Sequence, residues 1–281
     1  MGDVNRLPLF PVASADEIFS RLEIAFGEHE AARENSVEFK RPGLSAWAYA
    51  QEWAQRAVDR PEGAELPAYE PVYEPVRPEA FVSYAFGVAL GRFAPDGSGI
   101  CTAAPESALK HGILFLAATA ELDDHDTLGD PACAFLRATW AERGPSIAPD
   151  TTLRDYLRDH FFKKYHRPTY ENRPIYLPLS SASRNFVVWA SIHRWTPQTL
   201  QNVLAEYLRP EQIRLEGELA DLRAARGTKA RIAALSKLAD ELAQFIRDLQ
   251  ACAEQGPPPS DAKTPAREED ARFVMDLDDG V

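Results

Sequence analysis

The sequence predicts an α+β fold that is predominantly helical, in which a small domain containing a β-hairpin precedes a long antiparallel helical hairpin. Residues 173–181 (RPIYLPLSS) and 185–193 (NFVVWASIH) are rich in residues that favour strands. The short segment between them, residues 182–184 (ASR), is typical of a hairpin turn. From residue 197 to residue 255, apolar residues recur every three or four positions, which is the period of two helices packed against each other.

The composition indicates a globular chain without a membrane or metal signature. With 281 residues, 45% of them hydrophobic, the chain is long enough to bury a sizeable core. Its longest apolar run is far shorter than the roughly 20 residues of a membrane-spanning helix, and its first residues carry no export or acylation signal. Cys101, Cys133 and Cys252 form no CxxC pair, which argues against a disulfide framework or a zinc cluster. We expect a cytoplasmic protein with no membrane partner and no metal site.

Proline-rich and charged segments divide the chain into five expected parts. Residues 1–60 should form an N-terminal helical segment, and residues 61–77 an extended proline-rich connector. Residues 78–196 should form the α+β domain and residues 197–255 the helical hairpin. Residues 256–281, which begin GPPPSDAK, predict an acidic linker and tail.

Capping residues predict where several helices begin and end. The sequence SADE at residues 14–17 has the form of a capping box. Asp130 predicts the start of a helix that ends at residues 144–145 (GP), and Asp150 predicts the start of the next helix. Thr196, which precedes a proline, predicts the start of the first helix of the C-terminal hairpin.

Apolar runs and prolines give further expectations for the domain and the hairpin. Residues 112–116 (GILFL) predict a short buried strand. Pro174 and Pro178 cannot donate to a strand ladder, so the first strand of the β-hairpin should be an edge strand or irregular. Pro210 should break or kink its helix, and Gly227 should be the hinge between the two arms. The longer arm, of about 25 residues, is expected to pack through a heptad seam formed by Leu235, Leu238, Leu242, Phe245, Leu249 and Cys252.

The charge is distributed unevenly along the chain. The net charge is −12 at pH 7, which by itself speaks against a nucleic-acid partner. Residues 150–196, however, hold eight Lys and Arg against four Asp and Glu, together with His160, His166 and His193. A basic segment of this kind is often only a solvated face, but it is also the composition that contacts phosphate groups.

Recognised catalytic motifs are absent. The sequence contains no HExxH, EF-hand, Rossmann, phosphate-loop or Ser-His-Asp pattern. Asp123, Asp124, His125 and Asp126 could in principle hold a divalent metal, but a solvated loop before the next helix is the simpler interpretation. Residue chemistry alone therefore leads to an α+β protein with a basic segment and a helical hairpin.

Five parts of the sequence carry a family resemblance. Residues 172–210 (NRPIYLPLSSASRNFVVWASIHRWTPQTLQNVLAEYLRP), the heptad hairpin and the final DLDDGV together resemble the C-terminal region of large adenine-specific DNA methyltransferases. These enzymes occur in BREX and DISARM phage-defence systems and in related single-chain restriction-modification enzymes. Residues 81–93 (FVSYAFGVALGRF) resemble that family's SYAxGxxxGRY helix, and the basic run before residue 173 resembles the lead into its RPIYW strand.

The resemblance implies a DNA target-recognition domain followed by a helical spacer, within an enzyme of antiviral defence or restriction-modification. Members of the family bind S-adenosylmethionine in a methylase domain that carries a glycine-rich loop and an [NDS]PP[YFW] tetrapeptide. Neither motif occurs in this sequence. We therefore expect no catalytic residue and no cofactor in this chain, and we expect S-adenosylmethionine only in a methylase partner or a missing domain.

The expected partners are double-stranded DNA, a methylase domain or subunit, and other defence-system proteins. The alternative is a protein-interaction subunit of a defence complex that does not bind DNA and assembles through its acidic N-terminal half. The expected DNA-binding residues are basic and lie in or beside the predicted hairpin: Lys163, Lys164, Arg167, Arg173, Arg184 and Arg194.

Overall fold

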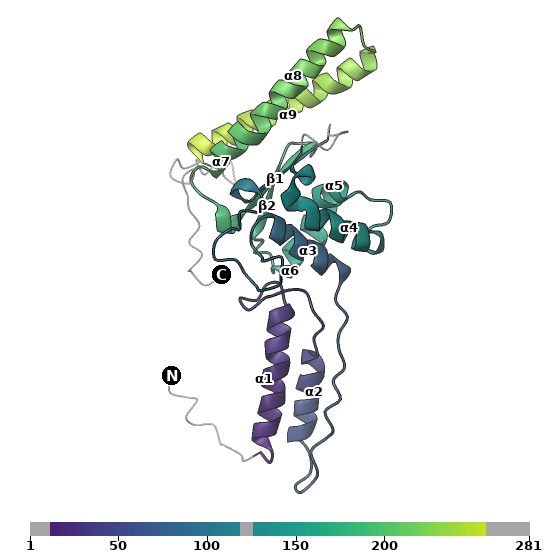
Figure 1. Ribbon diagram of the computed structural model, residues 1–281, viewed down its shortest axis with the longest axis vertical. Helices are drawn as coiled ribbons and strands as arrows, with labels where there is room; N and C mark the ends of the chain where they lie inside the picture. The colour runs from purple at the N-terminus through teal and green to yellow at the C-terminus, as the bar shows by residue number, and fades with distance from the viewer. Residues whose placement is uncertain (1–11, 119–125, 257–281) are drawn as a thin grey trace, which may run out of the picture.

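The computed structural model describes residues 12–118 and 126–256. The molecule is elongated, with three tiers along its long axis (Figure 1). A two-helix arm forms one end, a small sheet with its covering helices forms the centre, and a long helical hairpin forms the other end. The predicted α+β, predominantly helical class is confirmed. The predicted tail and residues 123–125 of the acidic cluster lie outside the described residues.

The sheet has three antiparallel strands in the order β1-β3-β2. The predicted hairpin is present as β2 (Tyr176–Ser180) and β3 (Phe186–Ser191), and β2 is an edge strand as its prolines predicted. The predicted buried strand, β1 (Ile113–Ala117), pairs with the other side of β3.

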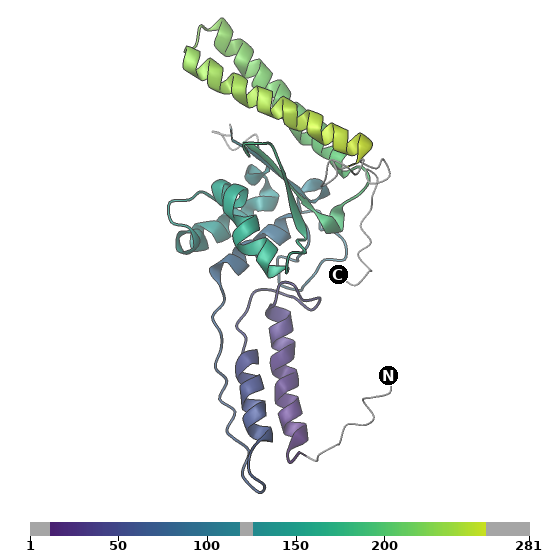
Figure 2. The same cartoon turned by 180° about the vertical axis from the view of Figure 1, so that it is seen from behind.

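Side chains that alternate along the strands bury both faces of the sheet. On one face, Leu114 and Trp189 pack against the helices that precede and follow β1. On the other face, Phe115 and Val188 pack against the C-terminal helices. Figures 1 and 2 show the sheet between these two groups of helices. A strand buried on both faces has a continuous apolar run, which is why ILFLA and FVVWA show no polar alternation.

The first face is covered by α3 (Pro78–Ala89), α4 (Ala134–Ile147) and a long irregular helix. This helix consists of α5 (Leu153–Asp155), the π-helical segment η5 (Tyr156–His166) and α6 (Arg167–Thr169). Single turns of 3₁₀ helix complete the domain: η2 (Lys110–Gly112), η3 (Thr127–Gly129), η4 (Pro131–Cys133) and η6 (Ile192–Arg194).

The second face is covered by the base of the helical hairpin. The chain passes through α7 (Thr199–Val203) and the π-helical η7 (Leu204–Leu208) into α8 (Arg209–Ala224), and α9 (Lys229–Gln255) returns beside it. Pro210 does not end the helix: the backbone stays helical through the wide π-helical turn of η7, which directly precedes Pro210, and α8 continues after it. The predicted seam residues of α9 that are buried are Leu235, Leu242, Phe245 and Leu249.

The arm consists of α1 (Ala15–Ala32) and α2 (Trp47–Val58). The proline-rich segment is extended and runs beside these two helices back to α3 (Figure 1). Trp53 is buried between the helices, and its indole N–H donates to the carbonyl of Pro67 at 2.9 Å. No helix in the described part of the chain combines the length and the apolar character needed to cross a bilayer.

Two predicted helix starts are wrong by two or three residues, and one predicted cap does not form. The α1 helix begins at Ala15, directly after Ser14 as the sequence predicts, but Ser14 adopts a left-handed conformation and its side chain makes no capping hydrogen bond, so the capping box does not form. Thr152 caps α5 in place of Asp150, because its hydroxyl accepts from the backbone N–H of Asp155 at 3.1 Å. Thr196 does not cap α7, which begins at Thr199.

The helix expected after Asp130 begins with the 3₁₀ turn η4, continues as α4 and ends later than predicted. The Asp130 carboxylate accepts from the backbone N–H of Ala132 at 2.7 Å, so Asp130 caps η4 and the predicted start is confirmed. The helix continues through Pro145 to Ile147, because Trp140 and Ile147 pack against the domain core and hold the last turn in place.

Candidate nucleic-acid interface

Within the basic segment, the residues around the two lysines fold as the π-helical η5, which lies against the sheet. Phe161 and Tyr165 are buried, and the Phe161 ring lies 5.6 Å from the Trp189 ring of β3. Lys163 and Lys164 fall between these apolar positions and are exposed. Burial of one side of the helix therefore directs the two lysines to the surface.

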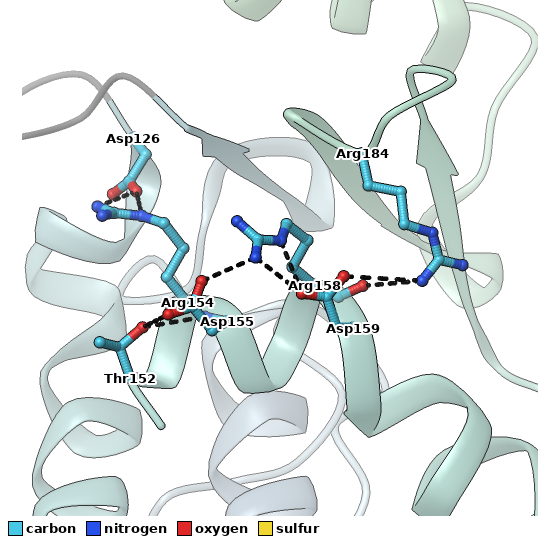
Figure 3. A network of polar contacts seen from close by, with 7 residues as sticks. All are labelled: Asp126, Thr152, Arg154, Asp155, Arg158, Asp159 and Arg184. Carbon is cyan, nitrogen blue, oxygen red and sulfur yellow. Dashed lines mark hydrogen bonds and ion pairs between the residues drawn. The ribbon is translucent and has the colours of Figure 1, made fainter. Parts of the chain in front are cut away.

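Acidic neighbours neutralise the basic residues at the start of this helix (Figure 3). Arg154 pairs at 2.5 Å with Asp126, whose side chain is fully buried. Arg158 contacts Asp155 at 3.0 Å and Asp159 at 2.8 Å. The hydrogen bond from Arg158 holds the pKa of Asp159 below its usual value. These arginines therefore add little positive charge to the surface.

Asp126 does not belong to a solvated loop, which was the simpler interpretation of the acidic cluster. Its carboxylate also accepts from the backbone N–H of Leu128 at 3.0 Å, so the residue starts a helical turn as well as pairing with an arginine. Among the described residues, no group of three His, Cys, Asp or Glu side chains is placed to hold a metal ion.

Arg184 lies at the tip of the β-hairpin, but its guanidinium turns toward η5. Nη1 lies 3.9 Å from Asp159 and 3.4 Å from the carbonyl oxygen of Arg158. The tip itself is held by Glu241 of α9, which accepts from the Ser181 hydroxyl at 2.5 Å and from the Asn185 amide at 2.7 Å. Burial opposes ionisation of Glu241, but these hydrogen bonds outweigh it and lower the pKa.

Arg194 points inward and supports the fold. Its Nη1 donates to the backbone carbonyls of Leu109 at 2.8 Å and of Leu90 at 3.4 Å. The side chain crosses Gly112, where a Cβ atom would lie 2.7 Å from Arg194 Cδ. Arg194 was predicted to bind DNA, but its guanidinium group is bound to the protein's own backbone.

The four remaining candidates are exposed cations: Lys163, Lys164, Arg167 and Arg173. In residues 12–118 and 126–256, no carboxylate lies within 4.0 Å of any of them. Arg167 donates from Nε to the amide oxygen of Asn172 at 2.9 Å, which is a neutral acceptor and leaves its charge uncompensated.

The histidines of the basic segment do not all add charge. His166 is fully buried, and its Nε2 accepts from the backbone N–H of Tyr176 at 3.0 Å. Burial lowers its pKa to about 3. The pKa of His193 is lowered to about 4 by burial and by the nearby charge of Arg92. Both imidazoles are therefore neutral at pH 7.

A pocket beside α6, which we call the Arg92 pocket, was not predicted. It has a volume of 210 Å³ and lies where the loop after α1 meets the central domain. Its lining includes Glu34, Arg92, Tyr170, Arg173 and His193. Sequence reasoning identified only Arg173 as a site residue here, because nothing in the pattern near Glu34 or Arg92 indicates that they approach it.

Glu34 is a buried carboxyl group with three hydrogen-bond donors. Its Oε1 accepts from Ser83 at 2.7 Å and from Tyr170 at 3.1 Å, and its Oε2 accepts from Tyr165 at 3.4 Å. Burial raises the pKa to about 7, although the three hydrogen bonds oppose this. The loop after α1 is thus tied to both α3 and the basic segment through one carboxyl group.

Two of the runs that carry the family resemblance meet beside this pocket. Ser83, Gly87 and Arg92 come from the FVSYAFGVALGRF run, and Arg173 and Tyr176 come from the NRPIY run. Gly87 allows the close approach, since a Cβ atom at this position would lie 2.6 Å from the Tyr176 hydroxyl oxygen.

Comparison with known proteins gives one informative likeness. No protein-family model matches the chain. The chain is 28% identical over 239 residues to the adenine-specific methyltransferase PglX of Lacticaseibacillus casei (strain Zhang). The match covers 72% of this chain and 18% of that protein, so the chain spans less than a fifth of the length of this relative. The chain therefore has sequence homology with an adenine-specific methyltransferase.

Proposed function

We propose that the chain is the DNA target-recognition and spacer region of an adenine-N6 DNA methyltransferase of a phage-defence or restriction-modification system. The observation that carries the proposal is the set of uncompensated cations Lys163, Lys164, Arg167 and Arg173 on a chain of net charge −12. The homology with an adenine-specific methyltransferase supplies the enzyme class.

The proposed interface uses these cations to hold the DNA backbone. Lysine and arginine displace the counterions condensed on phosphate groups, so binding should weaken steeply as salt increases. The rest of the chain is acidic and should repel DNA, which limits contact to the basic segment. Arg184 lies at the hairpin tip. If its ion pair with Asp159 breaks, its side chain can reach a groove of the DNA duplex. We do not include Arg194, because two backbone carbonyls occupy its guanidinium.

The test is a titration of labelled duplex DNA at low and moderate salt. Replacement of Lys163, Lys164 and Arg167 by Glu should abolish binding and leave the helical circular-dichroism signal unchanged, because all three side chains are exposed. The matched control replaces the exposed Lys229, Lys237 and Arg247 of α9 by Glu, which changes the net charge equally. The control should bind duplex as the wild type does, whereas the first variant should not bind. Equal binding by the wild type and the first variant, or binding that ignores salt, would contradict the proposal.

Methyl transfer is proposed to need a methylase domain or subunit that carries the cofactor. The sequence offers no [NDS]PP[YFW] tetrapeptide to hold a flipped adenine. The chain alone should therefore neither bind S-adenosylmethionine nor methylate DNA. Calorimetry that measured micromolar cofactor binding would contradict this expectation.

An exposed apolar stripe favours a second candidate function, that of a protein-interaction subunit. On the protruding arm, Phe19 is 65% exposed and Phe26 is 49% exposed, and the two residues are seven positions apart on α1. Apolar side chains grouped on a surface often mark a protein interface. Replacing both by Ser should then remove the chain from a co-expressed defence complex without weakening duplex binding. Unchanged assembly would exclude this surface.

A further inference from the structure

The Arg92 pocket contains a cation without a partner. Arg92 is half-buried, and within the described part of the chain its side chain makes no hydrogen bond or ion pair. Its Nε lies out of contact with solvent and has no acceptor. A guanidinium group is always charged in proteins and offers five donors, so leaving it half-buried and unpaired is unfavourable unless a ligand supplies acceptors.

Two further groups around the pocket can donate to the same ligand. Arg173 is exposed and lines the pocket, and it brings a second guanidinium group. His193 also lines the pocket, and its Nε2 is buried without a partner. Because the imidazole is neutral at pH 7, it can offer one N–H without adding charge.

The carboxyl groups of the pocket do not satisfy these donors. Glu34 accepts from Ser83, Tyr165 and Tyr170, so its oxygens are already engaged. Glu171 is exposed and lies more than 4.0 Å from every described cation. The pocket thus presents positive charge and donors that its own acidic residues leave unpaired.

We propose that the Arg92 pocket binds a phosphate group of the DNA backbone, with Arg92 beneath the phosphate and Arg173 at the mouth. This inference rests on the proposed function and deepens it. Planar guanidinium groups pair with two phosphate oxygens at once, and such contacts position a protein on DNA without reading its sequence. The pocket is lined by Tyr170 and Glu171, which directly follow α6 with its first residue Arg167, so the phosphate would extend the row of contacts made by the basic segment.

The first test compares duplex binding by the full chain and by single variants. Arg92→Gln and Arg173→Gln should each weaken duplex binding by about tenfold. Each should also reduce the slope of log affinity against log salt concentration by about one, as expected for the loss of one phosphate contact. The control, Arg56→Gln, removes an exposed arginine from α2 and should bind as the wild type does. Arg173 also belongs to the interface of the proposed function, so Arg92→Gln is the variant that tests the pocket itself. If Arg92→Gln does not fold, Arg92→Lys keeps the charge but loses the planar group, and it should still bind duplex more weakly than the control.

The second test uses sulfate as a phosphate mimic without DNA. At constant ionic strength, replacing chloride by sulfate should raise the melting temperature of the wild type and of Arg56→Gln more than that of Arg92→Gln. The comparison between proteins removes the general stabilising effect of sulfate.

The outcomes separate this inference from the proposed function. If the two pocket variants bind duplex as the control does, while the variant of the basic segment loses binding, the pocket inference is overturned and the proposed function stands. A second outcome is that sulfate raises the melting temperature less in Arg92→Gln than in the wild type while Arg92→Gln binds duplex as the wild type does. This result would identify a site for a free oxyanion and overturn the assignment to DNA. A wild-type chain that does not bind duplex would overturn both.

Discussion

Replacing Glu34 by Gln should remove a pH dependence from the stability of the protein. The pKa of this buried carboxyl group is about 7 in the folded chain, compared with 4.5 for an unperturbed glutamate. Between these two values the folded chain keeps a proton that the unfolded chain has lost. The free energy of unfolding therefore decreases as the pH rises through this window, and the ionised group is least favourable above pH 7.

The size of the effect follows from the difference between the two pKa values. At about 1.4 kcal/mol for each pKa unit, the stability contributed by the neutral carboxyl group should fall by about 2–3 kcal/mol from pH 5 to pH 8. The amide introduced by Glu34→Gln does not titrate in this range. The free energy of unfolding of the variant, relative to that of the wild type, should therefore increase by about this amount between pH 5 and pH 8. This holds whatever the stability of the variant at pH 5.

The assay is urea unfolding followed by circular dichroism at pH 5, 6, 7 and 8. His166 and His193 give the opposite trend, since their lowered pKa values make stability rise with pH up to about 6.5. Their contribution is common to both proteins and cancels in the difference. Glu38→Gln removes a charge from an exposed position in the same loop and is the control. A difference between Glu34→Gln and wild type that is independent of pH would refute the reasoning.

Three further variants test the packing. Leu242→Ala, at a fully buried position in the core shared by the sheet and the C-terminal helices, should reduce the free energy of unfolding by about 2–5 kcal/mol, and an unchanged melting temperature would show that the seam is assigned wrongly. Gly87→Ala should cost about 1–3 kcal/mol, because the new Cβ atom would lie 2.3 Å from the Phe93 ring, and wild-type stability would contradict this close approach. Asp126→Ala should cost about 3 kcal/mol by removing the ion pair with Arg154, and this loss should shrink in the Arg154→Ala background if the ion pair carries it.

Much of the local structure could be predicted because it depends on near neighbours in the sequence. The β-hairpin follows from two runs of strand-forming residues and a short turn, and the edge position of β2 follows from Pro174 and Pro178. The α9 helix follows from its apolar period. Helix ends were predicted less well, since Thr152 and Asp150 are both good caps and only the packing of the helix decides which is used.

The candidate site could be predicted only in part. Lys163, Lys164, Arg167 and Arg173 were predicted from charge, and the structure leaves them exposed. Nothing in the spacing of charges separates these residues from Arg194, which belongs to the same basic segment. Whether an arginine faces solvent or a backbone carbonyl depends on segments far away along the chain.

The sequence by itself determined the kinds of element in this protein, their order and the location of the basic segment, because hydrophobic period, capping residues and charge are local properties. The tertiary structure decided the pairing of β1 with β3 and the meeting of Glu34 with Ser83 and Tyr170, which join segments 49 to 136 positions apart. It also decided which cations stay unpaired. These outcomes depend on burial, which brings distant groups together and makes an unmatched charge or donor costly.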